Sequence, residues 1–488
     1  MKTQPSQVMS QVLMSVGENR VRLVDLYFDE KIARIQPCID QDIQWDDISD
    51  PEKWESFKEE FPASVFPQQI QVHQGNFMLL IPGAIDTHVH FNTPGFEHRE
   101  TFETGSYAAA CGGVTMVVDM PCTSLPPVNS AINFERKRKI VERRSYVDYA
   151  FWGGVRGNDF ALHKNVNRFI AELSRVGVAG FKVYTISGMR SFHYLNQECL
   201  LQTACWVSRT AKPLAVHAED RLYVRYKQHR YQTKWQNDWR AYCDSRDDIA
   251  EARAVARLIY IAQKSNAKVH ITHLSSALGL EQVRRARLEG LDFTCETCPH
   301  YLYFTQQDFE NTEISAFLKT APPVKNDYDR EALWDGLKDG SISFVTTDHA
   351  GCDPVKEKSD WNFWGVYGGI PGVEHRVPFL FSEGFKKGRL TLEETIQLLS
   401  TQAANFLNLA HRKGRLKVGM DADLALVNLW DSQIINAADM HSKGKYTPFE
   451  NVEFDAIIEK TFVRGKNVFN RFEPEIAEPG HGEFLKIS

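Results

Sequence analysis

The sequence predicts an α/β protein: a (β/α)8 barrel of the TIM type with a small β-sandwich domain built from the N- and C-terminal segments. From residue 82 onward, apolar strand-like runs alternate with amphipathic stretches of helical period, and eight such strand candidates follow one another. Short strand-like runs without intervening helices flank this region at both ends. We therefore expect sandwich strands in 1–80, the barrel in 81–412 and further sandwich strands in 413–488.

The composition is that of an ordinary globular chain of 488 residues, long enough for one large domain and a smaller one. A net charge of −6 gives no reason to expect a nucleic acid or an acidic membrane as partner. No apolar run approaches the ~20 residues of a membrane span, and the polar start is unlike a signal peptide. Nine cysteines, an odd number without framework spacing, suit a reducing cytoplasm. We expect a cytoplasmic protein.

The first strand-like runs, separated by turn residues, are Gln11–Val16, Val21–Phe28 and Lys31–Ile35. The acidic segment Asp40–Pro62, with Trp45 and Trp54, indicates a surface insertion or a short helix. No functional motif lies here.

The barrel strands are expected at Ala84–Phe91, Val114–Met120, Val147–Gly153, Ala179–Tyr184, Pro213–Ala218, Lys268–Leu274, Leu291–Thr297 and Ser343–Asp348. Helices are expected at Arg99–Cys111, Asn133–Arg144, Ala161–Val176, Leu195–Thr210, Ile249–Lys264 and Leu278–Glu289. A doubly wound open sheet is the alternative, but no Gly-rich phosphate fingerprint follows the first strand.

Beyond the eighth strand, helical stretches are expected at Pro371–Gly384 and Thr391–Leu409. Strand-like runs then return at Asp423–Asn428, Asp455–Val463 and Val468–Phe472. The simplest arrangement pairs these strands with the N-terminal ones. The C-x-x-C pair Cys295 and Cys298 lacks the second pair that a structural zinc site needs, so we interpret it as part of a strand end.

Histidine, aspartate or lysine stands at the ends of five predicted barrel strands, where such barrels gather their active-site residues. These residues are His88 and His90 (strand one), Lys182 (four), His217 (five), His273 (six) and Asp348 (eight). An isolated H-x-H would more often be two unrelated histidines that share one face of a strand. Ligand-type residues at four strand ends, with a lysine at a fifth, would rarely occur together by chance.

These residue types suit a hydrolytic site with two metals. Neutral imidazoles and a carboxylate favour zinc, manganese, iron or cobalt over calcium or magnesium. Two such cations can share a bridging water, lower its pKa and polarise a carbonyl. Lys182 is either a buried stem with a paired head or, once neutralised by desolvation, an amine that adds carbon dioxide to give a bridging carbamate.

Longer motifs extend this pattern from Pro82 to Asp423: PGAIDTHVHFNTPG, ETGSYAAACGGVTMVVDMP, GFKVY, LAVHAE, HITHLSS, ETCPHYL, LKTAPPV, TTDHAG and GRLKVGMDADLAL. With them the sequence resembles the cyclic amidohydrolases, the group of allantoinase, dihydroorotase and hydantoinase. The resemblance implies two divalent metals, zinc first, with manganese, cobalt or iron as alternatives. It implies as their ligands His88, His90, N6-carboxylated Lys182, His217, His273 and Asp348. It also implies that Asp348 takes a proton from the bridging hydroxide and passes it to the leaving nitrogen.

Within this group the sequence is most similar to allantoinases. Dihydroorotases typically carry an arginine, an asparagine and a histidine where Asn92, Cys122 and Cys352 stand here. Those groups hold a substrate carboxylate, and losing its cation would cost recognition heavily. FWGG at 151–154 and REALW at 330–334 also resemble allantoinases. The resemblance thus implies a cyclic amide or ureide as small-molecule substrate, with allantoin first.

Two features point to other members of the group. Val-Tyr follows Lys182 where allantoinases usually have Cys-Phe, and the segment 369–374 resembles dihydroorotase or hydantoinase. Asn92, Cys122 and Asn362 are therefore either substrate contacts or loop residues with local turn bonds. His300 and His349 are either near the site or structural.

A hydantoinase-like or dihydroorotase-like enzyme with altered recognition is thus the alternative. A scaffold protein on an inactive barrel would have lost ligands, whereas this chain keeps all six. The resemblance also implies a homo-oligomer, dimer or tetramer.

Overall fold

A closed ring of eight parallel strand segments forms the centre of the molecule. The computed structural model describes residues 5–473 and 477–488. Two sheets, β7-β8-β9 and β10 to β15, make up the ring, and a parallel bridge between Val89 and His349 joins its first and last strands. The strands are β7 (Ala84–Val89), β8 (Val114–Asp119), β9 (Asp148–Phe151), β10 (Gly153–Gly154), β11 (Phe181–Tyr184), β12 (Leu214–His217), β13 (Val269–Ile271), β14 (Phe293–Thr297) and β15 (Phe344–Val345). All eight predicted strands are present, the third as β9 and β10 on either side of Trp152.

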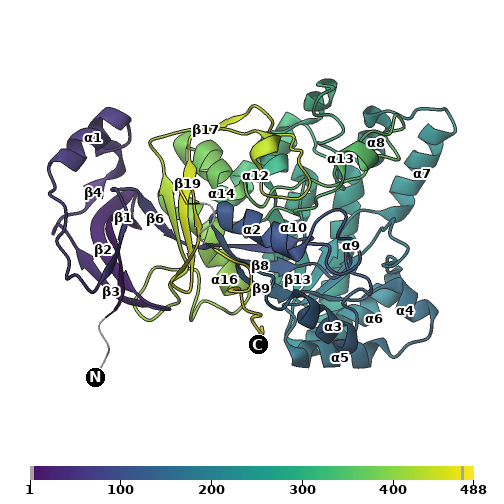
Figure 1. Ribbon diagram of the computed structural model, residues 1–488. Coiled ribbons are helices and arrows are strands. Elements are labelled where there is room, and N and C mark those ends of the chain that lie inside the picture. Colours follow the sequence, from purple (N-terminus) through teal and green to yellow (C-terminus); the bar gives the residue numbers. More distant parts are fainter. Residues whose placement is uncertain (1–4, 474–476) are drawn as a thin grey trace.

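Helices surround the ring on the outside (Figure 1). They are α2 (Phe102–Cys111), α3 (Ala131–Val141), α4 (Gly157–Ala161), α5 (Val166–Val176), α6 (Gln197–Val207), α7 (Arg221–Gln232), α8 (Trp239–Ser245), α9 (Asp248–Ser265), α10 (Ala277–Leu288) and α12 (Asp327–Lys338). Local signals fix their ends: the Asp247 side chain accepts from Ala250 N at the start of α9, and left-handed Gly177 ends α5. The sequence pattern missed α7, α8 and α12; α7 and α8 belong to a long insertion after β12 that carries little apolar periodicity.

The two helical stretches expected after β15 are interrupted by wider turns. The first consists of α14 (Arg376–Phe379) and the π-helical segment Leu380–Lys386. The second consists of α15 (Leu392–Ile396), the π-helical segment Gln397–Thr401 and α16 (Gln402–Phe406). Hydrophobic periodicity cannot reveal such turns, because they shift the register of a helix without breaking it.

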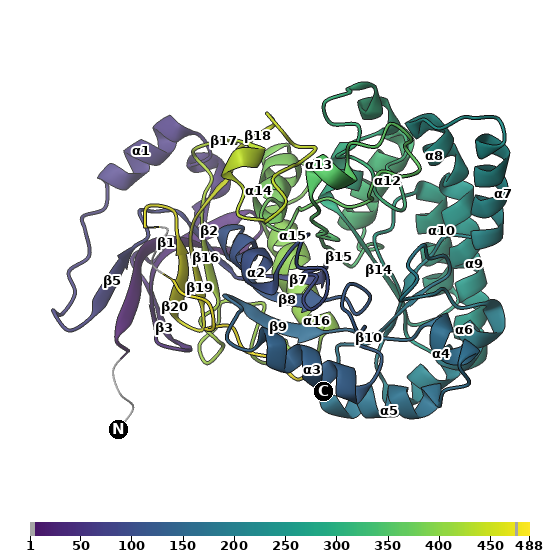
Figure 2. The same cartoon turned by 45° about the vertical axis from the view of Figure 1, so that its right-hand side comes forward.

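The terminal segments share one continuous sheet of order β20-β19-β16-β6-β1-β2-β3, with β4 on β2 and β5 on β1. Its strands are β1 (Gln7–Gly17), β2 (Arg20–Phe28), β3 (Ile32–Pro37), β4 (Ile43–Gln44), β5 (Gln71–Gln74), β6 (Leu79–Pro82), β16 (Leu424–Asn428), β19 (Ile457–Val463) and β20 (Lys466–Asn470). The sheet folds back on itself, so that its two arms come into contact. The ring centroids of Phe28 on β2 and Phe462 on β19 lie 5.5 Å apart, although the two strands are not neighbours in the sheet. Figure 2 shows this unit beside the barrel. The two layers of the expected sandwich are therefore arms of one sheet.

The acidic segment near residue 50 contains a short helix, α1 (Pro51–Glu59). The Asp50 side chain caps it by accepting from Lys53 N, and a proline occupies its first turn. Trp54 stacks on Trp430 at 4.7 Å, which attaches the helix to the C-terminal segment.

Buried charges connect the barrel to the sheet. Lys413 Nζ lies 2.8 Å from Asp148 Oδ2 on β9 and also pairs with Asp423 just before β16. Arg464 pairs with the other oxygen of Asp148. The C-terminal tail leaves the sheet and packs on the barrel, where Phe484 bridges to Tyr149. Among the described residues, no helix has the length and apolar character needed to cross a membrane.

Candidate active site

A cavity of about 760 Å³ lies at the carboxyl ends of the barrel strands. Its lining includes five of the six predicted ligand residues, together with Cys122 and Tyr184. The sixth, Lys182, lies on β11 and is fully buried. The five are His88, His90, His217, His273 and Asp348.

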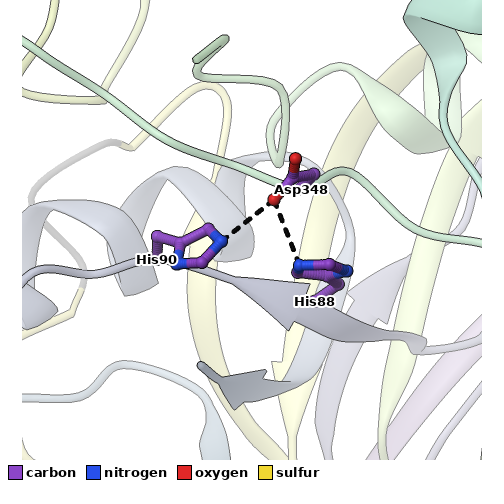
Figure 3. A group of neighbouring side chains, drawn as sticks. All are labelled: His88, His90 and Asp348. Atoms are coloured by element: carbon purple, nitrogen blue, oxygen red, sulfur yellow. Dashed lines mark hydrogen bonds and ion pairs between the residues drawn. The ribbon is translucent and has the colours of Figure 1, made fainter. Parts of the chain in front are cut away.

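His88, His90 and Asp348 form the tightest group (Figure 3). The two Nε2 atoms lie 3.1 and 3.0 Å from the same oxygen, Oδ1 of Asp348. The backbone enforces this meeting, because His90 N donates to His349 O at 2.8 Å across the seam of the barrel. Asp348 itself has a φ of 48°, a left-handed conformation that is uncommon outside glycine and is found disproportionately at functional sites.

The other three ligand candidates adjoin this group. The His273 ring centroid lies 5.4 Å from that of His88 and 4.8 Å from that of His217, and His217 Nδ1 is 3.0 Å from His273 Nε2. Lys182 Nζ donates to Thr272 Oγ1 at 2.6 Å. The structure therefore brings all six residues together at one end of the barrel.

The charge states of His217, His273 and Asp348 suit metal binding. Burial lowers the pKa of both His217 and His273, so that each ring is neutral at pH 7, as a ligand must be. Burial opposes ionisation of Asp348, but His88 and His90 hold the pKa of that carboxyl well below its ordinary value. His273 Nδ1 is buried and finds no hydrogen-bond partner among the described residues. Two neutral imidazoles, an ionised carboxylate and an unpartnered nitrogen fit a transition metal. At His88 and His90 the neighbouring groups outweigh burial and raise both pKa values, that of His90 to about 10, so a bound metal would have to displace a proton from each of these rings.

Burial also lowers the pKa of Lys182 to about 8, although Glu296 and Asp348 partly oppose the shift. A lysine with that pKa is neutral in part at pH 7, which is the state that reacts with carbon dioxide.

Two buried glutamates orient the histidines, and sequence reasoning missed both. Glu296 on β14 accepts from His88 Nδ1 and pairs with His270 Nε2 at 3.1 Å, which turns His88 Nε2 toward Asp348. Glu219 accepts from His217 Nε2 at 2.8 Å and pairs with Arg246, and these partners outweigh burial to lower its pKa to about 2. Glu296 could have been found, since a charged residue in an otherwise apolar strand of a barrel points to the interior.

The predicted substrate contacts lie in different places. Cys122 lines the cavity, with its Sγ 3.1 Å from Tyr184 Oη and 3.7 Å from His90 Nδ1. In the described part of the chain, neither Asn92 nor Asn362 lines the cavity. Asn92 is fully buried with a φ of 56°, and Asn362 Oδ1 accepts a local turn bond from Trp364 N. A loop position thus says little about where its side chain points.

The two ambiguous histidines are buried beside the site. His349 Nε2 lies 3.3 Å from Glu100 Oε2, and its Nδ1 accepts from Val373 N at 3.3 Å. The His300 ring lies 4.2 Å from that of Tyr301, tilted by 57°. Neither lines the cavity within residues 5–473 and 477–488, and the contacts of His349 are structural.

Comparisons with known proteins agree with this geometry. The sequence profile of the amidohydrolase family matches residues 79–468. The chain is 35% identical to an allantoinase of Rubrobacter xylanophilus over 80% of this chain and 84% of that one. It is 33% identical to an allantoinase of Enterococcus faecalis, over 84% and 89% of the two chains. Among solved structures, the L-hydantoinase of Arthrobacter aurescens superposes with a TM-score of 0.86 at 26% identity, covering 99% of this chain and all of that one.

Proposed function

We propose that this chain, which belongs to the amidohydrolase family and hydrolyses a cyclic amide C–N bond, acts on allantoin. The observation that carries the proposal is the joint placement of six ligand-type residues at one end of the barrel, in a chain that is 33–35% identical to several allantoinases.

The cations around the cavity support a substrate without a carboxylate. Arg246 pairs with Glu219, Arg99 pairs with Glu357, and Lys319 Nζ donates to the carbonyls of Phe363 and Val366. Each is already held by a protein acceptor. Arg190 lines the cavity but is exposed. A substrate carboxylate, as in dihydroorotate, would have to compete for one of these groups.

We propose that His88, His90, His217, His273, Asp348 and N6-carboxylated Lys182 hold two divalent metal ions, with zinc first and manganese, cobalt or iron as alternatives. Such ions, when bound, would acidify a water and polarise the scissile carbonyl. The carbamate forms when the neutral Lys182 amine adds to carbon dioxide and loses a proton.

The proton transfers would fall to Asp348, which His88 and His90 keep ionised. Its carboxylate accepts a proton from the attacking water and then donates it to the ring nitrogen as the C–N bond breaks. The products are a carboxylate and a ureido NH2 group on one opened chain. Burial raises the pKa of the Tyr184 hydroxyl well above its ordinary value, which keeps it protonated and able to donate to a substrate carbonyl.

The test is ring opening of allantoin, dihydroorotate, hydantoin and dihydrouracil by the zinc-loaded protein. We expect the highest kcat/KM for allantoin. Turnover of none of the four would overturn the proposed function, and turnover of dihydroorotate alone would overturn the choice of substrate. Hydantoin is the second candidate, favoured by the resemblance to L-hydantoinase along the whole chain.

We further propose a cytoplasmic homo-oligomer, dimer or tetramer. All nine cysteines are free thiols, which suits a reducing compartment. Large apolar side chains are exposed on and after α7, at Leu222, Tyr226 and Trp235, with 67, 67 and 85% of their surface accessible. Light scattering on the purified protein measures the subunit number, and a monomer would contradict this proposal.

A further inference from the structure

A second cavity, of about 280 Å³, lies where the barrel meets the C-terminal segment. Cys111 ends α2, Glu374 precedes α14, and His441 lies between β17 (Gln433–Ile434) and β18 (Glu453–Phe454). A ligand atom from each of the three lies within 4.8 Å of the others. In the described chain, none of the three lines the active-site cavity. We propose that Cys111, Glu374 and His441 form a second transition-metal site, for a zinc-type ion.

Hydrogen bonds hold these three residues in place independently of any ion. The Glu374 carboxylate accepts from His441 N at 2.9 Å and lies 2.7 Å from His441 Nδ1. Thr461 Oγ1 donates to Ala110 O at 2.7 Å, which fixes the end of α2 against β19. A site whose ligands are already positioned binds a metal without a large ordering cost.

Gly112 allows the loop that carries Glu374 to approach the end of α2. A Cβ at Gly112 would lie 2.6 Å from Glu374 O and 2.7 Å from Glu374 Cα. Real side chains do not tolerate such contacts, so only glycine lets Glu374 come this close to Cys111. The close approach therefore depends on a residue without a side chain next to the thiol.

The donor set selects the class of ion. A thiolate, an imidazole and a carboxylate suit zinc and its neighbours, whereas calcium and magnesium prefer oxygen ligands alone. Three protein ligands leave a fourth tetrahedral position for water or for a further side chain.

His375 supplies an independent observation. Its side chain lines the same cavity and is 5% exposed, and its Nδ1 has no hydrogen-bond partner among the described residues. A buried polar atom without a partner is unusual in a folded protein and marks a place where a water or an ion completes the hydrogen bonding. An ion pair between Glu374 and His441 alone would explain neither this nitrogen nor the position of Cys111.

Binding must release a proton. Burial and the Glu374 carboxylate raise the pKa of the Cys111 thiol well above its ordinary value, so the free site holds a protonated sulfur. The metal–sulfur bond forms as the S–H bond breaks, and the proton goes to solvent, while His441 binds through a neutral nitrogen. The affinity should therefore rise with pH, with one proton released for each ion bound.

The test uses cobalt(II) added to the metal-stripped full-length protein. A thiolate bound to cobalt gives a near-ultraviolet charge-transfer band, and the six residues proposed for the active site include no thiol. We expect the band in the wild type and in Cys199→Ser, a control thiol on α6, and its loss in Cys111→Ser. Cys122→Ser should also keep the band, and this result would show that the active-site cysteine is not its source.

Equilibrium dialysis with zinc gives a second readout that needs no turnover. The wild type should bind one more ion per chain than Cys111→Ser or His441→Ala, and circular dichroism confirms that each variant folds. His441 is 34% exposed at its side chain, so its removal is compatible with folding if Cys111→Ser fails to fold. A wild type without the band, or equal zinc stoichiometry in wild type and His441→Ala, would overturn the proposal. Neither result bears on the substrate.

Discussion

The substitution Glu296→Gln tests whether a buried carboxylate sets the orientation of His88. Glu296 is fully buried and accepts from three neighbours: His88 Nδ1, His270 Nε2 at 3.1 Å and Thr87 Oγ1 at 3.3 Å. A glutamine keeps the shape but replaces one acceptor oxygen with an N–H donor. That donor must then face a donor of His88, His270 or Thr87.

Two magnitudes follow from this geometry. Carboxylates that support a metal-ligating histidine typically contribute roughly 10–100-fold to metal affinity or activity, or about 1.4–2.7 kcal/mol. A buried donor left without its acceptor costs about 1–3 kcal/mol, so the free energy of unfolding should fall by that amount. We therefore expect kcat/KM for ring opening to fall about 10–100-fold through a smaller bound-metal fraction.

The assay combines metal content by atomic emission, ring-opening kinetics at one fixed, sub-saturating concentration of free zinc, and urea denaturation. Glu459→Gln is the control: Glu459 is 3% exposed but lies on β19, in the folded sheet. It should lose stability and keep its metal content and kcat/KM. If Glu296→Gln kept the zinc content and the kcat/KM of the wild type within twofold, the role assigned to Glu296 would be wrong.

Three further outcomes are expected. Asp348→Asn should lower kcat about 10²–10⁴-fold, because the group that carries the proton is lost. Its circular dichroism spectrum should stay unchanged, and a kcat within tenfold of the wild type would contradict that role. Because the pKa of Lys182 is lowered to about 8, its neutral fraction grows as pH rises. At a fixed concentration of dissolved carbon dioxide, the metal-stripped protein supplied with zinc should therefore regain activity faster at higher pH, until the rate levels off above that value. A rate independent of pH, or an unchanged response in Lys182→Ala, would contradict carbamate formation. Lys413→Met leaves the buried Asp423 without its cation, while Asp148 keeps Arg464, and should lower the free energy of unfolding by about 3–5 kcal/mol. Lys387→Met, in an exposed pair, should change it by at most about 1 kcal/mol. Equal effects in denaturant titrations would refute the argument.

The barrel could be predicted because its signal is local. Each strand is a short apolar run and most helices carry an amphipathic period, so all eight strands were found in order. The family resemblance then assigned His88, His90, Lys182, His217, His273 and Asp348, and the structure gathers these side chains at one cavity.

The rest depends on three-dimensional context that a sequence pattern does not contain. Asn92 follows the H-x-H motif, yet it is fully buried with a positive φ, and neither polar atom of its side chain has a hydrogen-bond partner among the described residues, none of which the motif reveals. Glu296 acts through His88 and His270, which lie on other strands, so no spacing along the chain identifies its partners. Glu219 follows His217 by two residues, but only the structure shows that it contacts the His217 ring. The single folded sheet depends on pairing between β6 and β16, strands more than 300 residues apart.

That pairing also has a consequence during protein synthesis. Strand β6 ends at Pro82, and the strand that covers its edge, β16, begins at Leu424. At about 5–20 residues per second, a ribosome needs roughly 20–70 s to make the intervening chain. Throughout that interval β6 has an open edge, which is a template for wrong pairing. The long separation between the paired strands therefore makes closure of this sheet a late step in folding.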